Sequence, residues 1–363
     1  MIRVLQIVTY MGRGGLETMI MNYYRNIDRN KVQFDFLVHR QEEADYDKEI
    51  LSLGGNIYRM PVLNPFSKSY FNALDEFFKE HKYDIVHSHL DCMSAYPLMV
   101  AKKNGVSVRI AHSHSKSQDK NLKYPIKLFS KRLIPKYATQ LFSCGKEAGD
   151  WMFNGKPYTI LNNAIDAEKC MFNFDVSVEV RKELNINNSD LVVGHVGRFN
   201  PPKNHSFIID VFNCLNKKCP DSKLLLVGTG DGQKAIKDKV NELGLNDSVL
   251  FLGSRSDVNR ILQAMDVFFF PSIYEGLPLS IVEAQAAGLP CVISTNVPDE
   301  CIKTDRVYQY SLEEDLDVWA EKLIDASKIV KKDTYNEIVS SGFDIKNNSK
   351  VLEDFYTSFN FGE

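Results

Sequence analysis

The sequence alternates short apolar stretches with longer amphipathic ones along its whole length, and this rhythm constrains the fold more than any other feature. Residues 2–8 (IRVLQIV) predict a first strand, Gly12, Gly14 and Gly15 predict a loop, and residues 16–25 predict a helix. Strands that alternate with helices in this way form βαβ units with a parallel sheet. The same order recurs, with further strands predicted at 33–39, 56–59, 84–87, 106–111, 140–143, 191–196, 223–227, 249–253 and 266–270.

The chain length predicts two domains, because 363 residues exceed what one ordinary hydrophobic core can hold. The polar stretch from Ala167 to Asp190 is the best candidate for the boundary between them. The formal net charge is -3. Because nucleic-acid-binding surfaces are normally basic, this charge gives no reason to expect nucleic acid as a partner.

The cysteine pattern and the hydropathy predict a cytoplasmic protein. Seven cysteines form no C-x-x-C pair, and their odd number does not suit a disulfide framework, so we expect reduced thiols. The apolar run 2–8 is short and contains Gln6, so it predicts a strand and not a secretion leader. No apolar run approaches the roughly 20 residues that span a bilayer, so any membrane contact is expected to be peripheral.

The stretch from Pro271 to Pro290 (PSIYEGLPLSIVEAQAAGLP) places two carboxylates, Glu275 and Glu283, on either side of a predicted turn. The apolar run before it predicts a buried strand, and residues 280–287 predict a short helix. Glu275 then lies in the loop at the carboxyl end of the strand, and Glu283 lies in the first turns of the helix.

The predicted start of this helix is a candidate anion site, because the first N–H groups of a helix have no partner within it. The amides around Leu279 and Ser280 can therefore hold a diphosphate, while the two glutamates accept hydrogen bonds from a ribose and a sugar. An alternative is that Ser280-x-x-Glu283 forms a capping box, in which Glu283 only satisfies an amide of its own helix.

Two other loops after predicted strands can contact phosphates. The loop 197–204 (GRFNPPKN) carries Arg198 and Lys203, whose cationic groups can grip both phosphates of a nucleotide diphosphate; the alternative is ordinary surface charge. Gly14 and Gly15 let a backbone approach a phosphate closely, or they form only a tight turn. Their spacing is not G-x-G-x-x-G, which disfavours a nicotinamide cofactor.

Two predicted strands end in His-x-His pairs, IVHSHL with His87 and His89, and IAHSHS with His112 and His114. Ligands of parallel sheets gather beyond the carboxyl ends of strands, so these side chains are candidate site residues. Two such pairs suggest zinc at first sight, but no cysteine or carboxylate at ligand spacing joins them, so we expect no metal. A single histidine in such a place is more often a hydrogen-bonding residue of the core or a loop.

A local basic segment runs from Lys116 to Lys136, with seven basic residues and one acid interleaved with apolar side chains. One interpretation is a solvated helix that packs on the sheet. The other is a surface that docks on anionic lipid headgroups, to which each lysine adds about 1 kcal/mol.

These motifs resemble the retaining glycosyltransferases of family 4. Residues 275–294 (EGLPLSIVEAQAAGLPCVIS) are similar to the E-x7-E signature of that family, and the Gly-Arg and Lys of loop 197–204 resemble its diphosphate-binding loop. The resemblance implies an α/β GT-B fold, with two Rossmann-like doubly wound parallel-sheet domains facing a central cleft. The expected domains are 1–166 for the acceptor, 167–345 for the nucleotide sugar, and a helix in 346–363 that packs back on the first domain.

The resemblance also implies roles for the candidate residues. Glu283 binds the donor ribose, Glu275 lies against the transferred sugar, and Arg198 and Lys203 neutralise the leaving diphosphate. His112 is expected near the acceptor and the sugar C6 hydroxyl. The other implied site residues are Gly14, Gly15, Gly276, Leu279 and Ser280 at the donor, Arg255 near its base, and His89 and His114 on the acceptor side.

The expected function is transfer of a sugar, with retention of its anomeric configuration, from a nucleotide diphosphate sugar to a hydroxyl of a saccharide. The acceptor is expected to be lipid-linked, in bacterial surface polysaccharide biosynthesis, and no cofactor or metal is expected. Two alternatives are a nucleotide-sugar 2-epimerase with the same architecture and a non-catalytic sugar-binding protein.

Overall fold

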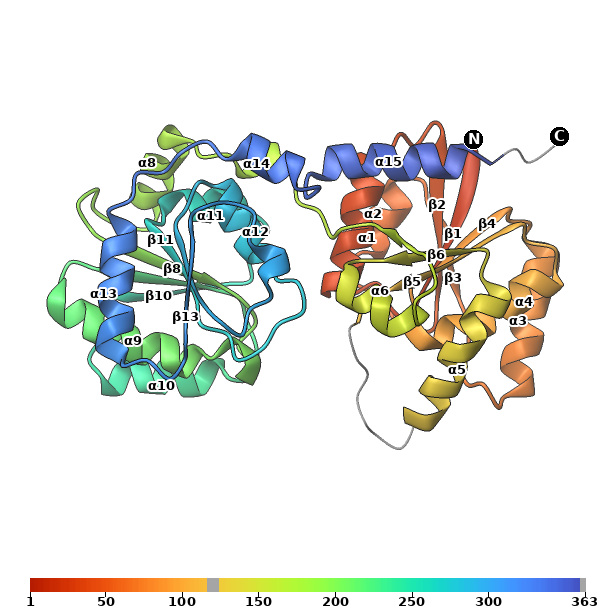
Figure 1. Ribbon diagram of the computed structural model, residues 1–363, viewed down its shortest axis with the longest axis horizontal. Coiled ribbons are helices and arrows are strands. Elements are labelled where there is room, and N and C mark those ends of the chain that lie inside the picture. Colours follow the sequence, from red (N-terminus) through yellow and green to blue (C-terminus); the bar gives the residue numbers. More distant parts are fainter. Residues whose placement is uncertain (116–123, 360–363) are drawn as a thin grey trace. The chain divides into compact units, whose positions relative to one another are not determined.

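The computed structural model describes residues 1–115 and 124–359. It forms two compact units, one made of Met1–Ala164 and Ile345–Glu363, the other of Ile165–Asp344 (Figure 1). The expected boundaries, 166/167 and 345/346, lie one or two residues later. Ile165 belongs to the second unit because its backbone N–H donates to Phe343 O (2.9 Å) and it forms a bridge with Asp344.

Unit 1 is built on a seven-stranded parallel sheet with the strand order β3-β2-β1-β4-β5-β6-β7. The strands are β1 (Ile2–Val8), β2 (Val32–Val38), β3 (Ile57–Arg59), β4 (Ile85–Ser88), β5 (Val108–Ser113), β6 (Gln140–Ser143) and β7 (Thr159–Ile160). The helical segments are α1 (Gly15–Asn26), α2 (Asp47–Ser52), α3 (Lys68–Glu80), η1 (Asp91–Ser94), α4 (Ala95–Lys103), α5 (Tyr124–Tyr137), α6 (Lys146–Phe153) and α15 (Ile345–Thr357).

Both faces of this sheet are buried, because alternate side chains of each strand point to opposite sides. Val4 and Phe36 pack with α1 and α15 on one face. Leu5 and Leu37 pack with α3 and α4 on the other face. The last helix, α15, lies against α1 and buries Tyr356 in the first of these cores, so the end of the chain returns to the unit in which it began (Figure 1).

Unit 2 repeats the pattern with a six-stranded parallel sheet in the order β10-β9-β8-β11-β12-β13. Its strands are β8 (Val192–Val196), β9 (Lys223–Val227), β10 (Val249–Gly253), β11 (Val267–Phe270), β12 (Cys291–Ser294) and β13 (Val307–Tyr310). Its helical segments are α7 (Ala167–Cys170), α8 (Phe174–Glu183), η2 (Pro201–Lys203), α9 (His205–Lys218), α10 (Gln233–Glu242), α11 (Val258–Ala264), α12 (Leu279–Ala286), η3 (Asp299–Cys301), α13 (Leu316–Ser327) and α14 (Tyr335–Ser340).

The continuous apolar run of β11 reflects helices on both faces of the sheet. Phe268 and Phe270 pack with α11 and α12, whereas Val267 and Phe269 pack with α9 and with Trp319 of α13. A strand that is buried on both faces needs apolar residues at every position, which is why the run lacks the usual alternation.

The strand order reverses at one place in each sheet, between β1 and β4 in unit 1 and between β8 and β11 in unit 2. In doubly wound sheets, ligands bind beyond the carboxyl ends of the strands at this switch point. The loops after β1 and β4 carry Gly14 and His89, and those after β8 and β11 carry Arg198 and Glu275. The fold therefore gathers the candidate residues of each unit at its switch point.

Candidate active site

The loops after β8 and β11 are joined by backbone and side-chain hydrogen bonds in unit 2. The N–H of Ile273 donates to Pro202 O (2.8 Å), and Asn204 Nδ2 donates to Pro271 O (3.2 Å). Asn204 adopts a left-handed conformation (φ 57°), which turns the chain from η2 into α9. These contacts bring Lys203 on the first loop to Glu275 on the second.

Lys203 and Glu275 form an ion pair, with Nζ donating to Oε1 at 2.7 Å. Their side chains are only 17% and 11% exposed. The ammonium also lies 4.5 Å from the centroid of the Phe270 ring, a cation–π contact. The carboxylate is therefore held in one orientation, and the two residues predicted to contact the diphosphate and the sugar are neighbours.

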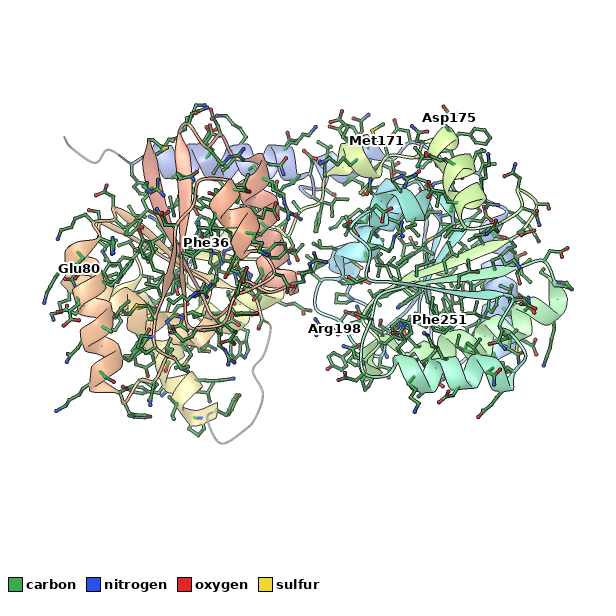
Figure 2. All side chains as sticks on the ribbon, turned by 180° about the vertical axis from the view of Figure 1, so that it is seen from behind. Phe36, Glu80, Met171, Asp175, Arg198 and Phe251 are labelled. Atoms are coloured by element: carbon green, nitrogen blue, oxygen red, sulfur yellow. The ribbon has the colours of Figure 1, made fainter. Side chains whose placement is uncertain are left out.

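Arg198 is exposed and forms no ion pair with a residue that the structure describes (Figure 2). Its loop is held by its backbone: the N–H of Gly197 donates to Val227 O (2.9 Å), and that of Phe199 donates to Thr229 O (3.0 Å). The guanidinium is thus carried by an ordered loop and is available to an anion.

Gly228 makes this arrangement of loops possible. A Cβ at this position would lie 2.1 Å from the carbonyl oxygen of Gly197, and φ is +136°. Only glycine combines that backbone conformation with so close an approach.

The capping-box alternative is wrong. Helix α12 begins at Leu279 with Pro278 as its N-cap, and no side chain caps it. Ser280 lies inside the helix instead of at its cap, because Pro278 already ends the preceding loop. The amides of Leu279 and Ser280 therefore have no partner within the helix. A Cβ at Gly276 would meet no atom within 4 Å, so a ligand can approach the backbone before the helix.

Glu283 is half-buried on α12, and its carboxylate forms no side-chain hydrogen bond within the described parts of the chain. Burial raises the pKa of Glu283 to about 7. The Glu283 charge is also one cause, after burial, that raises the pKa of the Cys170 thiol. A carboxylate that is partly withdrawn from water and has no donor among the described residues is unfavourable, and ligand hydroxyl groups would relieve that cost.

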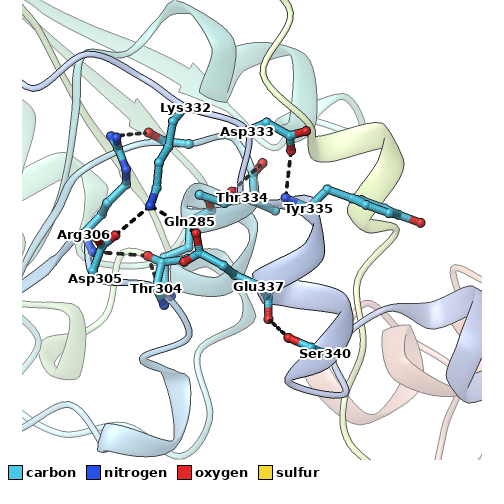
Figure 3. Close-up of polar contacts among 12 residues, drawn as sticks. Gln285, Thr304, Asp305, Arg306, Lys332, Asp333, Thr334, Tyr335, Glu337 and Ser340 are labelled. Carbon is cyan, nitrogen blue, oxygen red and sulfur yellow. Dashed lines mark hydrogen bonds and ion pairs between the residues drawn. The ribbon is translucent and has the colours of Figure 1, made fainter.

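Helix α12 is fixed at its other end by Gln285 (Figure 3). The Oε1 atom of Gln285 accepts from the N–H of Lys303 (2.7 Å) and of Thr304 (2.9 Å), while its Nε2 donates to Cys301 O (2.7 Å). Thr334 Oγ1 donates to the backbone carbonyl of Gln285 (2.6 Å). This buried network holds the helix that carries Glu283.

Arg255 forms an ion pair with the neighbouring Asp257. Its Nε and Nη2 donate to the two carboxylate oxygens of Asp257 at 2.8 and 2.7 Å. A bidentate pair of this kind leaves the guanidinium less available to a ligand. The expected contact of the donor base is with the backbone around Arg255, which this side-chain pair leaves free, and it stays a prediction.

In unit 1, the glycine loop ends directly in a helix. Helix α1 begins at Gly15, with Gly14 as an N-cap that provides no side-chain hydrogen bond. A Cβ on Gly15 would meet no atom within 4 Å. The N–H of Gly14 donates to Gly12 O (3.0 Å), whereas Gly15 offers a helix-start amide, as a phosphate contact requires. Both glycines remain predicted donor-binding residues.

The four predicted histidines lie in one buried cluster at the ends of β4 and β5. His87 Nε2 and His112 Nδ1 are hydrogen-bonded at 3.1 Å, and His89 Nδ1 and His114 Nε2 at 2.9 Å. Burial lowers the pKa of each of them, and that of His114 falls to about 3, so all four imidazoles are neutral at pH 7. His112 Nε2 is buried without a hydrogen-bond partner among the described residues.

Two residues that the sequence analysis missed complete this cluster. Tyr356 of α15 has its hydroxyl 2.7 Å from His87 Nδ1, and Gln6 of β1 has Oε1 2.8 Å from His89 Nε2. The amide nitrogen of Gln6 also donates to the Tyr356 hydroxyl (3.5 Å). No local pattern points to Tyr356, because 269 positions separate it from His87.

The directions of these hydrogen bonds follow from the chemistry of the partners. The Gln6 amide N–H donates to the Tyr356 hydroxyl, and His87 Nδ1 is the other described partner of that hydroxyl. Because His87 Nδ1 is then the available acceptor for the phenol's own proton, we assign that proton to this hydrogen bond. His87 then carries its proton on Nε2 and donates it to His112 Nδ1. The remaining proton of neutral His112 therefore lies on Nε2, which makes that atom a hydrogen-bond donor.

Three of these imidazoles come close enough to hold a metal ion, since ligand atoms of His87, His89 and His112 lie within 4.8 Å of one another. The rings of His87 and His89 are stacked at 4.3 Å and 22°. Because imidazole lone pairs lie in the ring plane, stacked rings do not direct them at one point. The hydrogen-bond interpretation therefore suits this geometry better, and the absence of a metal from the reaction stays a prediction.

Part of the basic segment 116–136 lies outside the described residues, which resume with α5 at Tyr124. Ser130 and Ile134 of that helix are buried, and Lys131 lies 4.3 Å from the ring centroid of Trp151. The helix is thus packed on the unit and still presents other cations to solvent. Within the described parts of the chain, every helix is too short or too polar to span a bilayer.

Comparison with solved structures assigns the class of fold. HepE (Alr3699) of Anabaena, solved in complex with UDP-glucose, superimposes with a TM-score of 0.76 over 99% of this chain and 100% of that chain, at 17% identity. Two doubly wound units with the chain end returned to the first are the GT-B arrangement of glycosyltransferases.

Sequence comparison then assigns the family. Residues 13–169 match the model described as Glycosyltransferase Family 4, and residues 177–333 match Glycosyl transferases group 1. EpsF of Bacillus subtilis, named as a glycosyltransferase, is 36% identical over 98% of this chain and 96% of its own length. The UDP-Gal:alpha-D-GlcNAc-diphosphoundecaprenol alpha-1,3-galactosyltransferase of Escherichia coli is 28% identical over 78% of each chain. The chain belongs to the family 4 glycosyltransferases.

Proposed function

We propose that this glycosyltransferase transfers a sugar with retention of configuration from a UDP-sugar to a hydroxyl of a lipid-linked saccharide in bacterial surface polysaccharide synthesis. The observation that carries the proposal is the Lys203–Glu275 pair (2.7 Å) at the switch point of unit 2. The exposed Arg198 lies on the same loop as Lys203, and the uncapped start of α12 follows Glu275 along the chain. The UDP-glucose of the HepE complex and the donor and acceptor in the name of the Escherichia coli relative support the choice of substrates.

The proposed chemistry relies on electrostatics. Arg198, Lys203 and the first amides of α12 stabilise the charge that develops on the departing diphosphate, in place of a divalent cation. Glu275, oriented by Lys203, positions the sugar through its hydroxyl groups. The carboxylate of Glu283 accepts hydrogen bonds from the ribose hydroxyls, because no described residue donates to it.

His112 is proposed to donate a hydrogen bond from Nε2 to an oxygen of the substrate. Burial keeps the ring neutral, so it is not a source of positive charge. His89 and His114 are proposed to line the acceptor side through their hydrogen-bonded pair. We place the enzyme in the cytoplasm, with peripheral contact to the inner face of the plasma membrane.

A transfer assay with the purified full chain tests the proposal. UDP-sugars are incubated with a short-chain polyprenyl diphosphate saccharide in the presence of EDTA, and the product linkage is assigned by NMR. We expect a glycoside with the anomeric configuration of the donor. An inverted product contradicts the retaining mechanism, and loss of turnover that Mg²⁺ restores contradicts metal independence.

Incubation with the donor alone separates the two alternatives. An epimerised nucleotide sugar in that sample would indicate a 2-epimerase. Binding of the free sugar without any reaction would indicate a sugar-binding protein. A thermal-shift comparison of UDP with GDP and ADP tests the base, since a ligand that binds only the folded state raises the Tm.

A further inference from the structure

Unit 1 contains a cavity that none of the proposed catalytic residues lines. Its volume is about 480 Å³, within the usual range of small-molecule sites. The lining residues come from the carboxyl ends of β1, β2, β3 and β4 and from the first turn of α5. They are Thr9, His39, Arg40, Val62, Leu63, Asn64, Pro65, Phe66, Leu90, Met93, Ile126 and Lys127.

The wall of the cavity is mainly apolar, and part of it is open to solvent. The side chains of Val62 and Phe66 are 68% and 77% exposed. Exposed large apolar side chains gathered at one hollow mark a binding surface for an apolar ligand. His39 does not offer a polar contact here, because its two ring nitrogens are already bonded to Val8 O and the Tyr70 hydroxyl.

The charged lining of the same cavity is cationic. Arg40 is exposed, and its guanidinium forms a long ion pair with Glu42, Nη1 to Oε1 at 3.9 Å. Lys127 forms no ion pair with a described residue. Because the lining formed by the described residues includes no aspartate or glutamate, the cavity suits a ligand with an apolar chain and an anionic group.

The cavity adjoins the histidine cluster along the chain. Leu90 of the lining directly follows His89, and Thr9 directly follows β1, whose Gln6 bonds His89. A ligand anchored in the cavity is therefore held at the same edge of the sheet as the predicted acceptor-side residues.

We propose that this cavity binds the phosphate-proximal part of a polyprenyl chain, with Arg40 and Lys127 contacting its phosphate. This inference rests on the proposed function, because it assigns the lipid part of the lipid-linked acceptor. The apolar wall contributes affinity because it buries the polyprenyl chain. The two cations bind the phosphate and so fix the position of the chain in the cavity.

Calorimetric titration of the full chain with farnesyl diphosphate, in saturating UDP, tests the proposal. We expect it to bind at least tenfold more tightly than inorganic pyrophosphate, and Phe66→Asp to remove most of that gain. Leu51→Asp is the matched control, because Leu51 is 58% exposed on α2 of the same unit and does not line the cavity. Equal binding of farnesyl diphosphate and pyrophosphate, or an unchanged affinity in Phe66→Asp, overturns the proposal.

A vesicle arm separates a polyprenyl site from a general membrane contact. Vesicles of phosphatidylglycerol are compared with the same vesicles containing undecaprenyl phosphate, and tighter binding to the second is expected only when Phe66 is intact. No preference between the two overturns the polyprenyl assignment. UDP binding in unit 2 should be the same in Phe66→Asp and the unchanged chain, so a failure of this inference is distinguishable from a failure of the proposed function.

Discussion

At the scale of single residues, the Lys203–Glu275 pair can be tested by substitution of either partner, which should lower the rate of transfer. Lys203→Ala removes the positive charge that stabilises the departing diphosphate, and it also removes the ion-pair partner that orients Glu275. Glu275→Gln removes the negative charge that pairs with Lys203. Each should lower kcat by about 10²-fold or more, as loss of one electrostatic contact does elsewhere. The measurement is the initial rate of transfer, together with the Tm.

Both variants should stay folded, because the pair lies at the edge of the sheet and not within its core. The control is Lys239→Ala, which breaks the 2.6 Å pair with Asp210 between α10 and α9 of the same unit. Near-normal transfer in either site variant contradicts the roles proposed for Lys203 and Glu275.

Because the pKa of Glu283 is raised, we expect the affinity for the donor to depend on pH. This pKa is about 7 in the empty protein, and hydrogen bonds from ribose hydroxyls favour the ionised form, so donor binding should lower it. Binding then releases a proton near and below pH 7, and the affinity for UDP should rise as the pH increases through 7. Calorimetry in buffers of different ionisation enthalpy measures this proton directly.

The Glu283→Gln variant should bind UDP more weakly and without that proton release. The thermal stability of the protein gives a second check. Because the pKa of Glu283 is raised to about 7 in the folded state, ionisation of this carboxyl lowers the free energy of unfolding above pH 7. That cost vanishes below about pH 4.5, where the carboxyl is protonated in both the folded and the unfolded state. The Tm of Glu283→Gln should therefore exceed that of the unchanged chain at pH 8 but not at pH 4.5. The opposite trend would contradict a buried carboxyl.

Tyr356 is a positioning residue. Through its hydrogen bond to His87, which in turn contacts His112, it determines which nitrogen of His112 carries the proton. Tyr356→Phe removes the donor to His87 Nδ1, so His87 and His112 can exchange tautomers. We expect a drop in kcat of about tenfold, the lower end of what loss of a partner that orients a metal-bound histidine costs. Histidine ¹⁵N shifts should show His112 protonated on Nε2 in the unchanged chain and mixed in the variant.

Tyr24→Phe is the control for that experiment. It removes a hydroxyl from another buried tyrosine of unit 1, which donates to Leu53 O and lies outside the histidine cluster. If both variants change the rate equally and leave the His112 shifts unaltered, Tyr356 has only a structural role.

At the scale of elements, the glycine contact between the loops after β8 and β9 determines where Arg198 is held. Gly228→Ala should destabilise unit 2 by several kcal/mol and abolish UDP binding, because its Cβ would lie 2.1 Å from Gly197 O. Gly244→Ala is the comparison: its φ is also positive (+69°), but a Cβ would meet no atom within 4 Å. Strain alone then costs about 1–2 kcal/mol. Urea unfolding and UDP titration measure the two effects.

Elements were also what the sequence predicted best. The continuous apolar run of β11 indicated a buried strand, and α12 begins within one residue of its predicted start. The capping box failed because Pro278, not Ser280, is the N-cap. A spacing pattern cannot distinguish these two positions, since the cap depends on the backbone conformation of the loop before the helix.

At the scale of the whole molecule, the segment 116–136 predicts binding to anionic vesicles that weakens with salt. Seven cations attract acidic headgroups at low ionic strength, and salt screens that attraction over about a Debye length. Co-sedimentation with phosphatidylglycerol vesicles at 20 and 500 mM NaCl measures it, and phosphatidylcholine vesicles are the control. If the chain does not bind anionic vesicles at low salt, the segment 116–136 is not a membrane-docking surface.

The sequence alone determined the succession of parallel strands and helices, because period, burial and turn residues are local properties of the chain. It also identified the loops that carry the candidate residues. Only the tertiary structure decided which distant side chains pair: Lys203 with Glu275, and His87 with Tyr356. Such pairs depend on strand order and on how loops fold against one another, and those contacts join residues too far apart in the sequence to leave a pattern.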